Sequence, residues 1–497
     1  MRAKISRMDY ELVVGLEVHA ELLTRSKMFC ACPVLDNTES LPNRAVCPVC
    51  EGLPGALPVI NAHAVELAMR VALALNCRVH NTSIFARKNY FYPDLPKGYQ
   101  VSQFEDPLAT DGELKVSTAQ GEKVIRVRRA HLEEDTGKLT HLTDDEGNAC
   151  TLIDLNRAGV PLLEIVTEPD MRSVEEVKAY AAALRAILRE VGACSGDMEK
   201  GAMRLEANIS LRPAGSAEYG TRVEVKNLNS FRAMERAIEF EVQRQAAILD
   251  QGGTIDQETL GWNEDGEYTY TQRSKEDAHD YRYFPEPDLP PLFVSDAWIA
   301  QVKTSLPELP AERQARFAQQ YTLSPADALN LSQDLDRAAY FEKAVGAADK
   351  LGVTAKVMSN WMLGEIFAWL NARAESPTDL KVAPQALAEL ASLAEKGEIN
   401  LTTAKAVLTE MLETGSAAAE IVKAKGLTQV SDAGVIAALV SQVIDANPKE
   451  LASFLAGKET LSNWFFGQVM REAKGQANPQ VLRTELEKQL KERKISA

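Results

Sequence analysis

Val14-Gly-Leu-Glu17-Val-His19-Ala-Glu21 places two acids and one histidine two positions apart, with apolar residues between them. Arg204-Leu-Glu206-Ala-Asn208 and Arg222-Val-Glu224-Val-Lys226 repeat this pattern further along the chain. Residues two apart in an extended strand point to the same face of a sheet. Each stretch therefore predicts a strand with one apolar face and one face of carboxylate, imidazole or cationic side chains.

The polar faces of these strands have two interpretations. A solvated antiparallel sheet also alternates apolar and polar residues, and a single strand of this kind indicates no more than that. Three strands rich in glutamate, with histidine, arginine and lysine among them, favour a site. Carboxylate oxygens are the ligands that Mg²⁺ prefers, and arginine or lysine beside them suits nucleotide phosphates. The pattern predicts a metal- and nucleotide-dependent enzyme.

Length and charge restrict the classes of protein. With 497 residues the chain is too long for one core and predicts about two to four domains. The net charge of −16 argues against a non-specific nucleic-acid binder, although it leaves room for a local cationic surface. Residues 467–497 reverse the balance, with seven Lys/Arg against four Glu, either as a solvated helix end or as such a surface.

No part of the sequence predicts membrane insertion. There is no run of 18 or more apolar residues, and the first residues lead into a strand-like stretch and not into the apolar core of a signal peptide. We therefore expect a cytoplasmic protein without membrane contact.

The order of predicted elements indicates an α+β fold. Short strands and helices alternate irregularly up to the proline-rich stretch 283–291, without the regular βα repeat of a parallel sheet. Amphipathic helices follow almost without strands, and from about residue 400 the chain is rich in Ala, Leu, Lys and Glu. We predict a catalytic domain over 1–292, a helical domain over 293–405 and a helical tail domain over 406–497.

Four of the seven cysteines form a compact set. Cys30-Ala-Cys32 is followed, after a short segment, by Cys47-Pro-Val-Cys50. Two close thiol pairs across a loop are typical of a tetrahedral Cys₄ zinc site, in which four thiolates fill the coordination sphere and the metal is structural. The alternative is four reduced thiols without metal. A disulfide framework is not expected, because the other cysteines stand alone and no secretion signal is present.

Two further stretches carry chemistry. His131-Leu-Glu133-Glu134-Asp135-Thr-Gly-Lys138 is an acidic cluster that suits Mg²⁺, or else a charged turn. Residues 87–100 are aromatic, basic and stiffened by proline, which suits stacking on unpaired bases of RNA, or else a packed loop. The sequence contains neither a phosphate-binding G-x-x-x-x-G-K-[ST] loop nor a G-x-G-x-x-G fingerprint. Any ATP site must therefore lie on the sheet face.

Taken together, the longest of these strings resemble one family, the B subunits of the bacterial tRNA-dependent amidotransferases (the GatB family). The match is dense over the first 290 residues and resumes near Ser359 and Gly467. The strings are Val14 to Leu22, Arg87 to Gln100, Leu132 to Lys138, Asp154 to Val166, Glu224 to Phe231, and Asp280-Tyr-Arg-Tyr-Phe-Pro-Glu-Pro-Asp288.

The resemblance implies a fold and a reaction. It implies a catalytic domain like that of glutamine synthetase, an antiparallel sheet flanked by helices, followed by helical and tail domains that hold the tRNA body. Members of this family use ATP to phosphorylate the side-chain carboxylate of glutamate on tRNA(Gln) or of aspartate on tRNA(Asn). Ammonia, released from glutamine by an amidase partner called the A subunit, then displaces the phosphate. A small C subunit completes a heterotrimer.

The resemblance also assigns roles to residues, motif by motif. It implies Mg²⁺ ligation by Glu17, His19, Glu134 and Glu224, with Glu133 and Glu206 as supporting or second-metal ligands. Lys226 and Arg204 are expected to meet ATP phosphates, and Glu164 is a candidate for the ammonia path. The cofactors expected are therefore ATP, Mg²⁺ and structural Zn²⁺. Only some members of the family carry the Cys₄ set, which agrees with a structural role.

Two other functions remain open from the sequence. A ligase for a small free glutamyl substrate would share the chemistry, but it leaves the C-terminal helical residues without a role and predicts activity without tRNA. A zinc-stabilised RNA-binding scaffold would explain the cysteines and the aromatic stretch. It predicts no ATP turnover, and it leaves the Glu/His strands unexplained.

Overall fold

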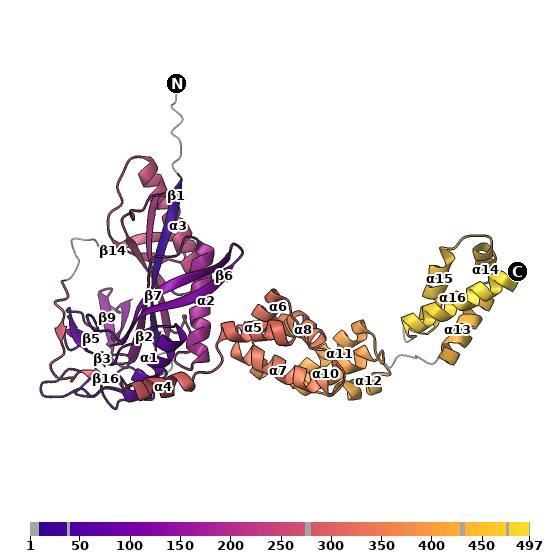
Figure 1. Cartoon of the computed structure of the whole chain (residues 1–497), viewed down its shortest axis with the longest axis horizontal. Helices are drawn as coiled ribbons and strands as arrows, with labels where there is room; N and C mark the ends of the chain where they lie inside the picture. Colours follow the sequence, from indigo (N-terminus) through magenta and orange to yellow (C-terminus); the bar gives the residue numbers. More distant parts are fainter. Residues whose placement is uncertain are drawn as a thin grey trace, which may run out of the picture. The chain divides into compact units, whose positions relative to one another are not determined.

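The computed structural model describes residues 9–36, 40–273, 280–373, 375–427, 433–473 and 477–496. The chain divides into two compact units, Met1–Pro310 and Ala311–Ala497 (Figure 1). All strands of the described residues belong to the first unit, and the second is helical. The predicted order, an α+β part followed by helices, is confirmed.

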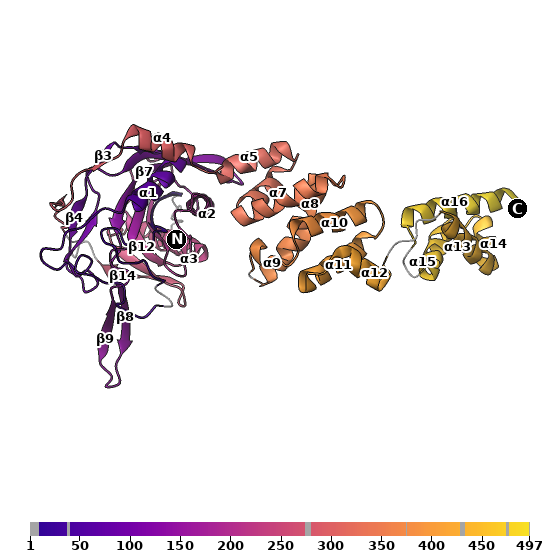
Figure 2. The ribbon, with the colours of Figure 1, turned by 90° about the horizontal axis from the view of Figure 1, so that it is seen from below.

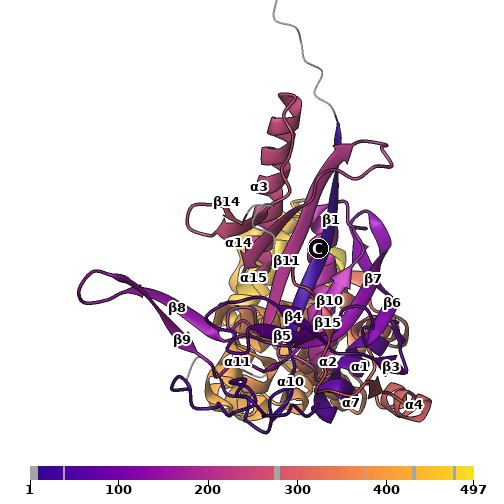
Figure 3. The same ribbon diagram turned by 90° about the vertical axis from the view of Figure 1, so that its left-hand side faces the viewer.

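A nine-stranded sheet forms the framework of the first unit, in the order β14-β13-β12-β11-β1-β10-β7-β6-β2. Neighbouring strands are antiparallel except β12 and β13, which are parallel. β1 is the middle strand and lies between β11 and β10 (Figure 3). The strands are β1 Tyr10–Glu21, β2 Arg78–Val79, β6 Ala109–Thr118, β7 Gly121–Glu134, β10 Pro161–Thr167, β11 Met203–Pro213, β12 Val223–Leu228, β13 Thr259–Asn263 and β14 Tyr268–Arg273.

Three helices cover the apolar face of this sheet: α1 Ala62–Ala74, α2 Val174–Glu190 and α3 Phe231–Asp250. Leu16 and Val18 of β1 are buried in one core with apolar residues of all three helices. Burial of a side chain of this size contributes about 1.5–3 kcal/mol. Because side chains alternate along a strand, burial of Leu16 and Val18 directs Glu17 and His19 to the opposite, helix-free face.

Ser173-Val-Glu-Glu176 at the start of α2 has the S-x-x-E pattern of a capping box, but its hydrogen bonds differ from that motif in one detail. Ser173 caps the helix, and its hydroxyl accepts from the N–H of Glu176 at 3.2 Å. In a capping box the glutamate would accept from the N–H of the capping residue itself. Here the Glu176 carboxylate accepts from the N–H of Arg172 at 2.6 Å and from Lys123. The return bond is therefore made one residue earlier than expected.

Smaller sheets border the polar face. β4 Ala86–Asn89 pairs with β5 Tyr99–Ser102 and with β15 Phe284–Pro285, and β3 Thr82–Ser83 pairs with β16 Leu292–Phe293. The hairpin of β8 Lys138–Thr143 and β9 Ala149–Asp154 projects from the first unit (Figure 2). We call residues 280–288 the strap. Arg87 of β4 fixes it by donating two bonds to Glu286, at 2.7 and 2.8 Å.

The first unit extends beyond the predicted boundary near 292. Helix α4, Asp296–Thr304, buries Val302 in the core of the sheet, and Trp298 and Ile299 pack against the same core. The compact unit accordingly ends at Pro310. The proline-rich stretch that suggested a boundary is instead the strap, which pairs with β4.

The second unit contains two separate apolar cores. The first runs from Phe317 to Val422 and the second from Ile436 to Leu490. Residue 405 lies within the range of the first core, and the domain boundary predicted there stays a prediction. Ser324 caps α6, with Pro325 in its first turn. None of the described helices is long and apolar enough to cross a membrane. The helices are α5 Pro310–Gln320, α6 Pro325–Ser332, α7 Leu335–Asp349, α8 Ala355–Trp361, η2 Met362–Ile366, α9 Phe367–Arg373, η3 Pro377–Asp379, α10 Pro384–Glu395, α11 Leu401–Thr414, α12 Ala418–Lys425, α13 Ala433–Ala446, α14 Pro448–Leu455, α15 Leu461–Glu472 and α16 Pro479–Ser496.

Candidate active site

Strand register assembles the polar face of the sheet. Glu17 of β1 lies opposite Glu206 of β11, and His19 lies opposite Glu164 of β10. The next strand, β7, places His131 opposite Glu164. Side chains directly opposite each other in antiparallel strands share a face and touch. Residues from distant parts of the sequence therefore meet in two neighbouring groups.

The first group, the His19 cluster, consists of His19, Glu133 and Glu164, whose ligand atoms lie within 4.8 Å of one another. His19 Nε2 is 3.5 Å from an oxygen of each glutamate, and His131 Nε2 is 3.2 Å from Glu164 Oε2. Burial lowers the pKa of His19, but the hydrogen bond to Glu164 and the surrounding carboxylates outweigh this effect and raise it to about 9. Two buried carboxylates beside an imidazole are a donor set that could hold a cation.

The second group, the Glu17 cluster, joins Glu17, Glu206 and Glu224, again with ligand atoms within 4.8 Å. Burial raises the pKa of Glu17, and the charges of the neighbouring carboxylates raise it further. Asn208 Nδ2 donates to Glu17 at 3.0 Å. Lys226 Nζ is 2.8 Å from Glu206 Oε2 and 3.6 Å from Glu224 Oε1. An all-oxygen set beside a lysine suits Mg²⁺ with a phosphate.

Both clusters line one cavity of about 1090 Å³. Strands β1, β7, β10, β11 and β12 supply its floor, and β4, β5 and the strap supply aromatic and polar side chains along its edge. A volume of this size accommodates a nucleotide together with part of a second substrate. The side chains that line the cavity include Glu17, His19, Lys88, Tyr90, Phe104, His131, Glu133, Asp135, Arg157, Glu164, Arg204, Glu206, Glu224, Lys226, Tyr281 and Tyr283.

Glu134 does not join either cluster, which corrects the grouping expected from the sequence. Its carboxylate accepts from the N–H of Val101 at 3.0 Å and from the Lys97 ammonium. It lines a second, smaller cavity of about 170 Å³ that also touches Cys50. Neighbouring residues of a strand point to opposite faces, so Glu133 and Glu134 cannot both reach the sheet's polar face. Glu133, expected as a supporting ligand, is the neighbour that lies in the His19 cluster, and the Mg²⁺ role of Glu134 stays a prediction.

Arg204, which was expected to meet ATP phosphates, already forms an ion pair within the protein. Its guanidinium is 2.9 Å from Asp135 Oδ2, and Arg157 lies 3.6 Å from the same oxygen. Burial raises the pKa of Asp135, but the charges of Arg204 and Arg157 outweigh burial and lower it to about 2. Arg204 still lines the cavity. Its charge is largely balanced by Asp135, whereas Lys226 is shared between ligands of the Glu17 cluster.

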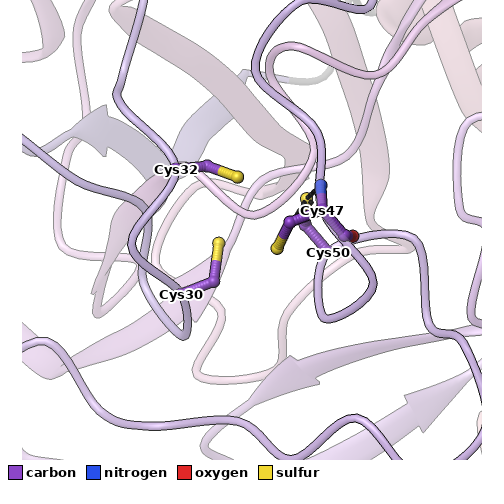
Figure 4. A group of neighbouring side chains, drawn as sticks. All are labelled: Cys30, Cys32, Cys47 and Cys50. Atoms are coloured by element: carbon purple, nitrogen blue, oxygen red, sulfur yellow. Dashed lines mark hydrogen bonds between the residues drawn. The ribbon is translucent and has the colours of Figure 1, made fainter.

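The four predicted zinc ligands lie together. The Sγ atoms of Cys30, Cys32, Cys47 and Cys50 lie within 4.8 Å of one another and face a common centre (Figure 4). The Cys47 and Cys50 sulfurs are 3.9 Å apart. In a tetrahedral site with Zn–S bonds of about 2.3 Å, the sulfurs are about 3.8 Å apart. The buried Lys27 ammonium lies 3.7 Å from Cys50 Sγ. The thiol geometry fits zinc.

Some cavity residues were not singled out from the sequence. The ammonium of Lys88 lies 5.0 Å from the centre of the Tyr281 ring. Tyr283 lies on the same edge of the cavity. Lys88 belongs to the aromatic and basic stretch 87–100, whose composition was the available signal. Its pairing with residues of the strap, almost 200 positions later, has no local signature.

Comparison with known proteins covers both units of the chain. A family model described as the GatB/GatE catalytic domain matches residues 12–300, and one described as the GatB domain matches residues 339–490. The first match contains both carboxylate clusters and the four cysteines. The two matches confirm, over most of the chain, the family resemblance seen in the sequence.

Similar curated proteins extend over nearly the whole chain. Over 485 residues it is 48% identical to the B subunit of the aspartyl/glutamyl-tRNA(Asn/Gln) amidotransferase of Thermodesulfovibrio yellowstonii, covering 98% of this chain and 100% of that one. The protein of the same name from Moorella thermoacetica is 49% identical over 483 residues, with 97% and 100% covered. That from Thermotoga maritima is 46% identical over 484 residues, with 97% and 99% covered. The chain belongs to the GatB family, the B subunits of the tRNA-dependent amidotransferases.

Proposed function

We propose that this chain uses ATP to phosphorylate the side-chain carboxylate of glutamate attached to tRNA(Gln), or of aspartate attached to tRNA(Asn), and then amidates it with ammonia. The choice of amino acids and tRNAs in this proposal follows the names of the similar proteins. The observation that carries the proposal is the presence of two cation-binding clusters in one cavity. The chain is in this view a ligase that forms a C–N bond.

The chemistry explains why ATP is needed. A carboxylate is a poor acyl donor because oxide would have to leave. Transfer of the γ-phosphoryl group to a carboxylate oxygen yields ADP and an acyl phosphate. The ammonia nitrogen then attacks the acyl carbon, the C–O bond to phosphate breaks, and the nitrogen loses a proton. Phosphoryl transfer requires positioning and charge neutralisation more than covalent help from the protein.

The two clusters have donor sets that suit Mg²⁺. Glu17, Glu206 and Glu224 would hold one ion, and His19 with Glu133 and Glu164 would hold another, as oxygen-rich sets of limited size. Bound Mg²⁺ would supply charge neutralisation for the phosphate oxygens. The chain's own contribution is positional, because β1 fixes one ligand of each cluster on a buried strand.

Lys226 is the side chain best placed to meet ATP phosphates. Its ammonium is held by Glu206 at 2.8 Å, on the cavity floor. Burial lowers the pKa of Lys226, but the charges of Glu206 and Glu224 outweigh burial and raise it well above its usual range, so the side chain stays a cation. Arg204 lines the same cavity, but its pair with Asp135 makes it the weaker candidate for a phosphate contact.

Ammonia and the body of the tRNA require other components. The relatives are named as one subunit of an amidotransferase, which supports an assembly with an amidase (the A subunit) and a small C subunit. Helices α15 and α16 carry the basic residues Arg471, Arg483 and Lys488, which support contact with the tRNA body. The product is used in translation, which favours a cytoplasmic location.

We further propose that Zn²⁺ binds the Cys₄ set and holds its loop against the first unit. Cys47→Ser is expected to weaken zinc binding by more than about 100-fold and to lower the midpoint of thermal unfolding, because it removes a direct ligand. Metal content by mass spectrometry and unfolding by circular dichroism measure both effects. Cys150→Ser, at a half-buried thiol of β9 outside this set, is the matched control. Unchanged zinc content in Cys47→Ser would contradict the assignment.

The proposed reaction is tested by γ-phosphate transfer. Labelled ATP, Mg²⁺ and the assembled amidase and small partners are combined with Glu-tRNA(Gln), uncharged tRNA or free glutamate. We expect phosphate release and amide formation only with the charged tRNA. Equal turnover with free glutamate would instead indicate a small-molecule ligase, and no turnover with any substrate would favour an RNA-binding scaffold.

A further inference from the structure

Four of the five aromatic side chains that line the cavity contact one another, and we call them the aromatic wall: Tyr90, Phe104, Tyr281 and Tyr283. Phe104 and Tyr283 are stacked, with ring centres 4.0 Å apart and planes at 6°. Tyr281 meets Tyr90 and Tyr283 edge to face, at 5.9 and 6.1 Å. The strap thus contributes two rings, Tyr281 and Tyr283, to a continuous aromatic surface. The family motif at residues 280–288 therefore lines the cavity.

The aromatic wall is not fully buried, unlike aromatic side chains in a hydrophobic core. Phe104 remains 43% exposed and lines the cavity together with its stacked partner Tyr283. Large aromatic side chains usually bury most of their surface. A stacked pair that still borders an open cavity offers a flat apolar surface to another planar ring.

The backbone that carries the wall is firmly held. Asn89 Nδ2 donates to the carbonyl oxygens of Arg282 at 2.8 Å and Tyr281 at 3.2 Å. The N–H of Asn89 donates to the Tyr281 carbonyl at 2.9 Å. Arg282 has a φ of +44°, a left-handed conformation that non-glycine residues avoid unless their surroundings impose it. This strained residue lies between Tyr281 and Tyr283, where it orients both rings.

The wall adjoins the His19 cluster and not the Glu17 cluster. Ser102, two residues before Phe104, donates its hydroxyl to Glu133 at 3.3 Å. Burial raises the pKa of Tyr283, and the charges of Glu133 and Glu164 add to this effect. The carboxylates around Glu17 are instead Glu164, Glu206 and Glu224. In the sheet, β7 with Glu133 and β12 with Glu224 and Lys226 lie on opposite sides of β1, so the order along the cavity is aromatic wall, His19 cluster, Glu17 cluster, Lys226.

We propose that the aromatic wall stacks on the 3′-terminal base of the aminoacylated RNA, so that the attached amino acid reaches the His19 cluster. This inference rests on the proposed function. Unpaired RNA bases are recognised by stacking on aromatic side chains. The Lys88 ammonium, 5.0 Å from the Tyr281 ring centre, adds positive charge next to the wall for the RNA backbone. ATP, whose phosphates favour the Lys226 end, places its own base away from the wall.

The first test separates the two substrates kinetically. Phe104→Ala in the assembled enzyme is expected to raise the KM for Glu-tRNA(Gln) by about 5- to 150-fold, because stacking contributes this factor per base, and to leave the KM for ATP unchanged. Phe293→Ala is the matched control, since Phe293 is 70% exposed in the same unit and does not line the cavity. A rise in the KM for ATP alone would assign the wall to adenine of ATP and overturn the proposal, as would no change in either constant.

A second test needs no turnover. Uncharged acceptor-stem RNA with its 3′-terminal adenosine is expected to bind the parent more tightly than RNA lacking that nucleoside. Phe104→Ala should remove this preference, and Phe104→Trp should keep it. Equal preference in the parent and Phe104→Ala would overturn the proposal. Failure of the proposed function would appear separately, as absent phosphate transfer in the parent enzyme.

Discussion

Glu17→Gln is expected to lower the turnover number for amidation by about 10²- to 10³-fold, because it removes a carboxylate ligand of the proposed Mg²⁺, the ion that would neutralise the phosphate oxygens in the transition state. Glutamine keeps the shape of the side chain and can still accept the Asn208 hydrogen bond. It also removes one of several crowded carboxylates, whose repulsion contributes to the raised pKa of Glu17. The fold should therefore be at least as stable as in the parent. Phosphate transfer at graded Mg²⁺ concentrations and thermal unfolding measure the two effects.

Glu122→Gln provides the control for this variant. Glu122 is an exposed carboxylate at the start of β7, in the same unit but outside the cavity. It should leave turnover, Mg²⁺ dependence and stability unchanged. Full activity of Glu17→Gln at every Mg²⁺ concentration would remove Glu17 from the proposed metal ligands. Binding of tRNA should persist in both variants, which separates lost chemistry from lost recognition.

Glu134→Gln should have the opposite outcome, a loss of stability of about 3–5 kcal/mol, because it leaves a buried ammonium without its counter-charge. The Lys97 and Glu134 side chains are only 10% and 4% exposed, and they form an ion pair. The glutamine oxygen can still accept from the N–H of Val101, so the charge is the main loss. Urea denaturation of the purified chain measures the free energy of unfolding.

Two further variants locate the origin of that loss. Lys97→Met combined with Glu134→Gln should recover most of the stability, since the unpaired charge is then absent. Glu133→Gln, at the neighbouring residue, removes a buried negative charge from a crowded cluster and should not destabilise the fold. If Glu133→Gln and Glu134→Gln lowered stability equally, the two side chains would not differ in environment as described.

Strand alternation is the part of the site that the sequence could predict. Glu17 and His19 share a face with Glu206 and Glu224 because Leu16, Val18, Leu205 and Val223 are the apolar partners in each strand. The same rule, counted from His131, selects Glu133 over Glu134. The motif resemblance points to Glu134 as a Mg²⁺ ligand, whereas the alternation places Glu133 on the polar face. The information for the observed placement of the two side chains is therefore present in the sequence, and which of them binds a metal stays a prediction.

Other parts of the site depend on strand order, which no local pattern encodes. Glu164 meets His19 only because β10 lies next to β1, although the two strands are about 145 positions apart in the sequence. The strap reaches β4 through the pair of Phe284 with Arg87. Its prolines indicated a domain boundary, since proline-rich stretches commonly link domains. Pairing at a sheet edge is the other environment in which proline is tolerated, and here it is the correct one.

The His19 cluster and the Glu17 cluster share a backbone, because Glu17 and His19 are successive outward residues of β1. Two residues of a strand span about 6.6–6.8 Å, a repeat set by covalent geometry and by hydrogen bonds to both neighbouring strands. β1 thus sets the distance between the two clusters. Insertions in the strap, which lines the cavity, can alter which molecules enter it, but they cannot change this spacing. Evolution of substrate choice in this fold is accordingly free to proceed in the loops while the distance between the two charge centres stays constant.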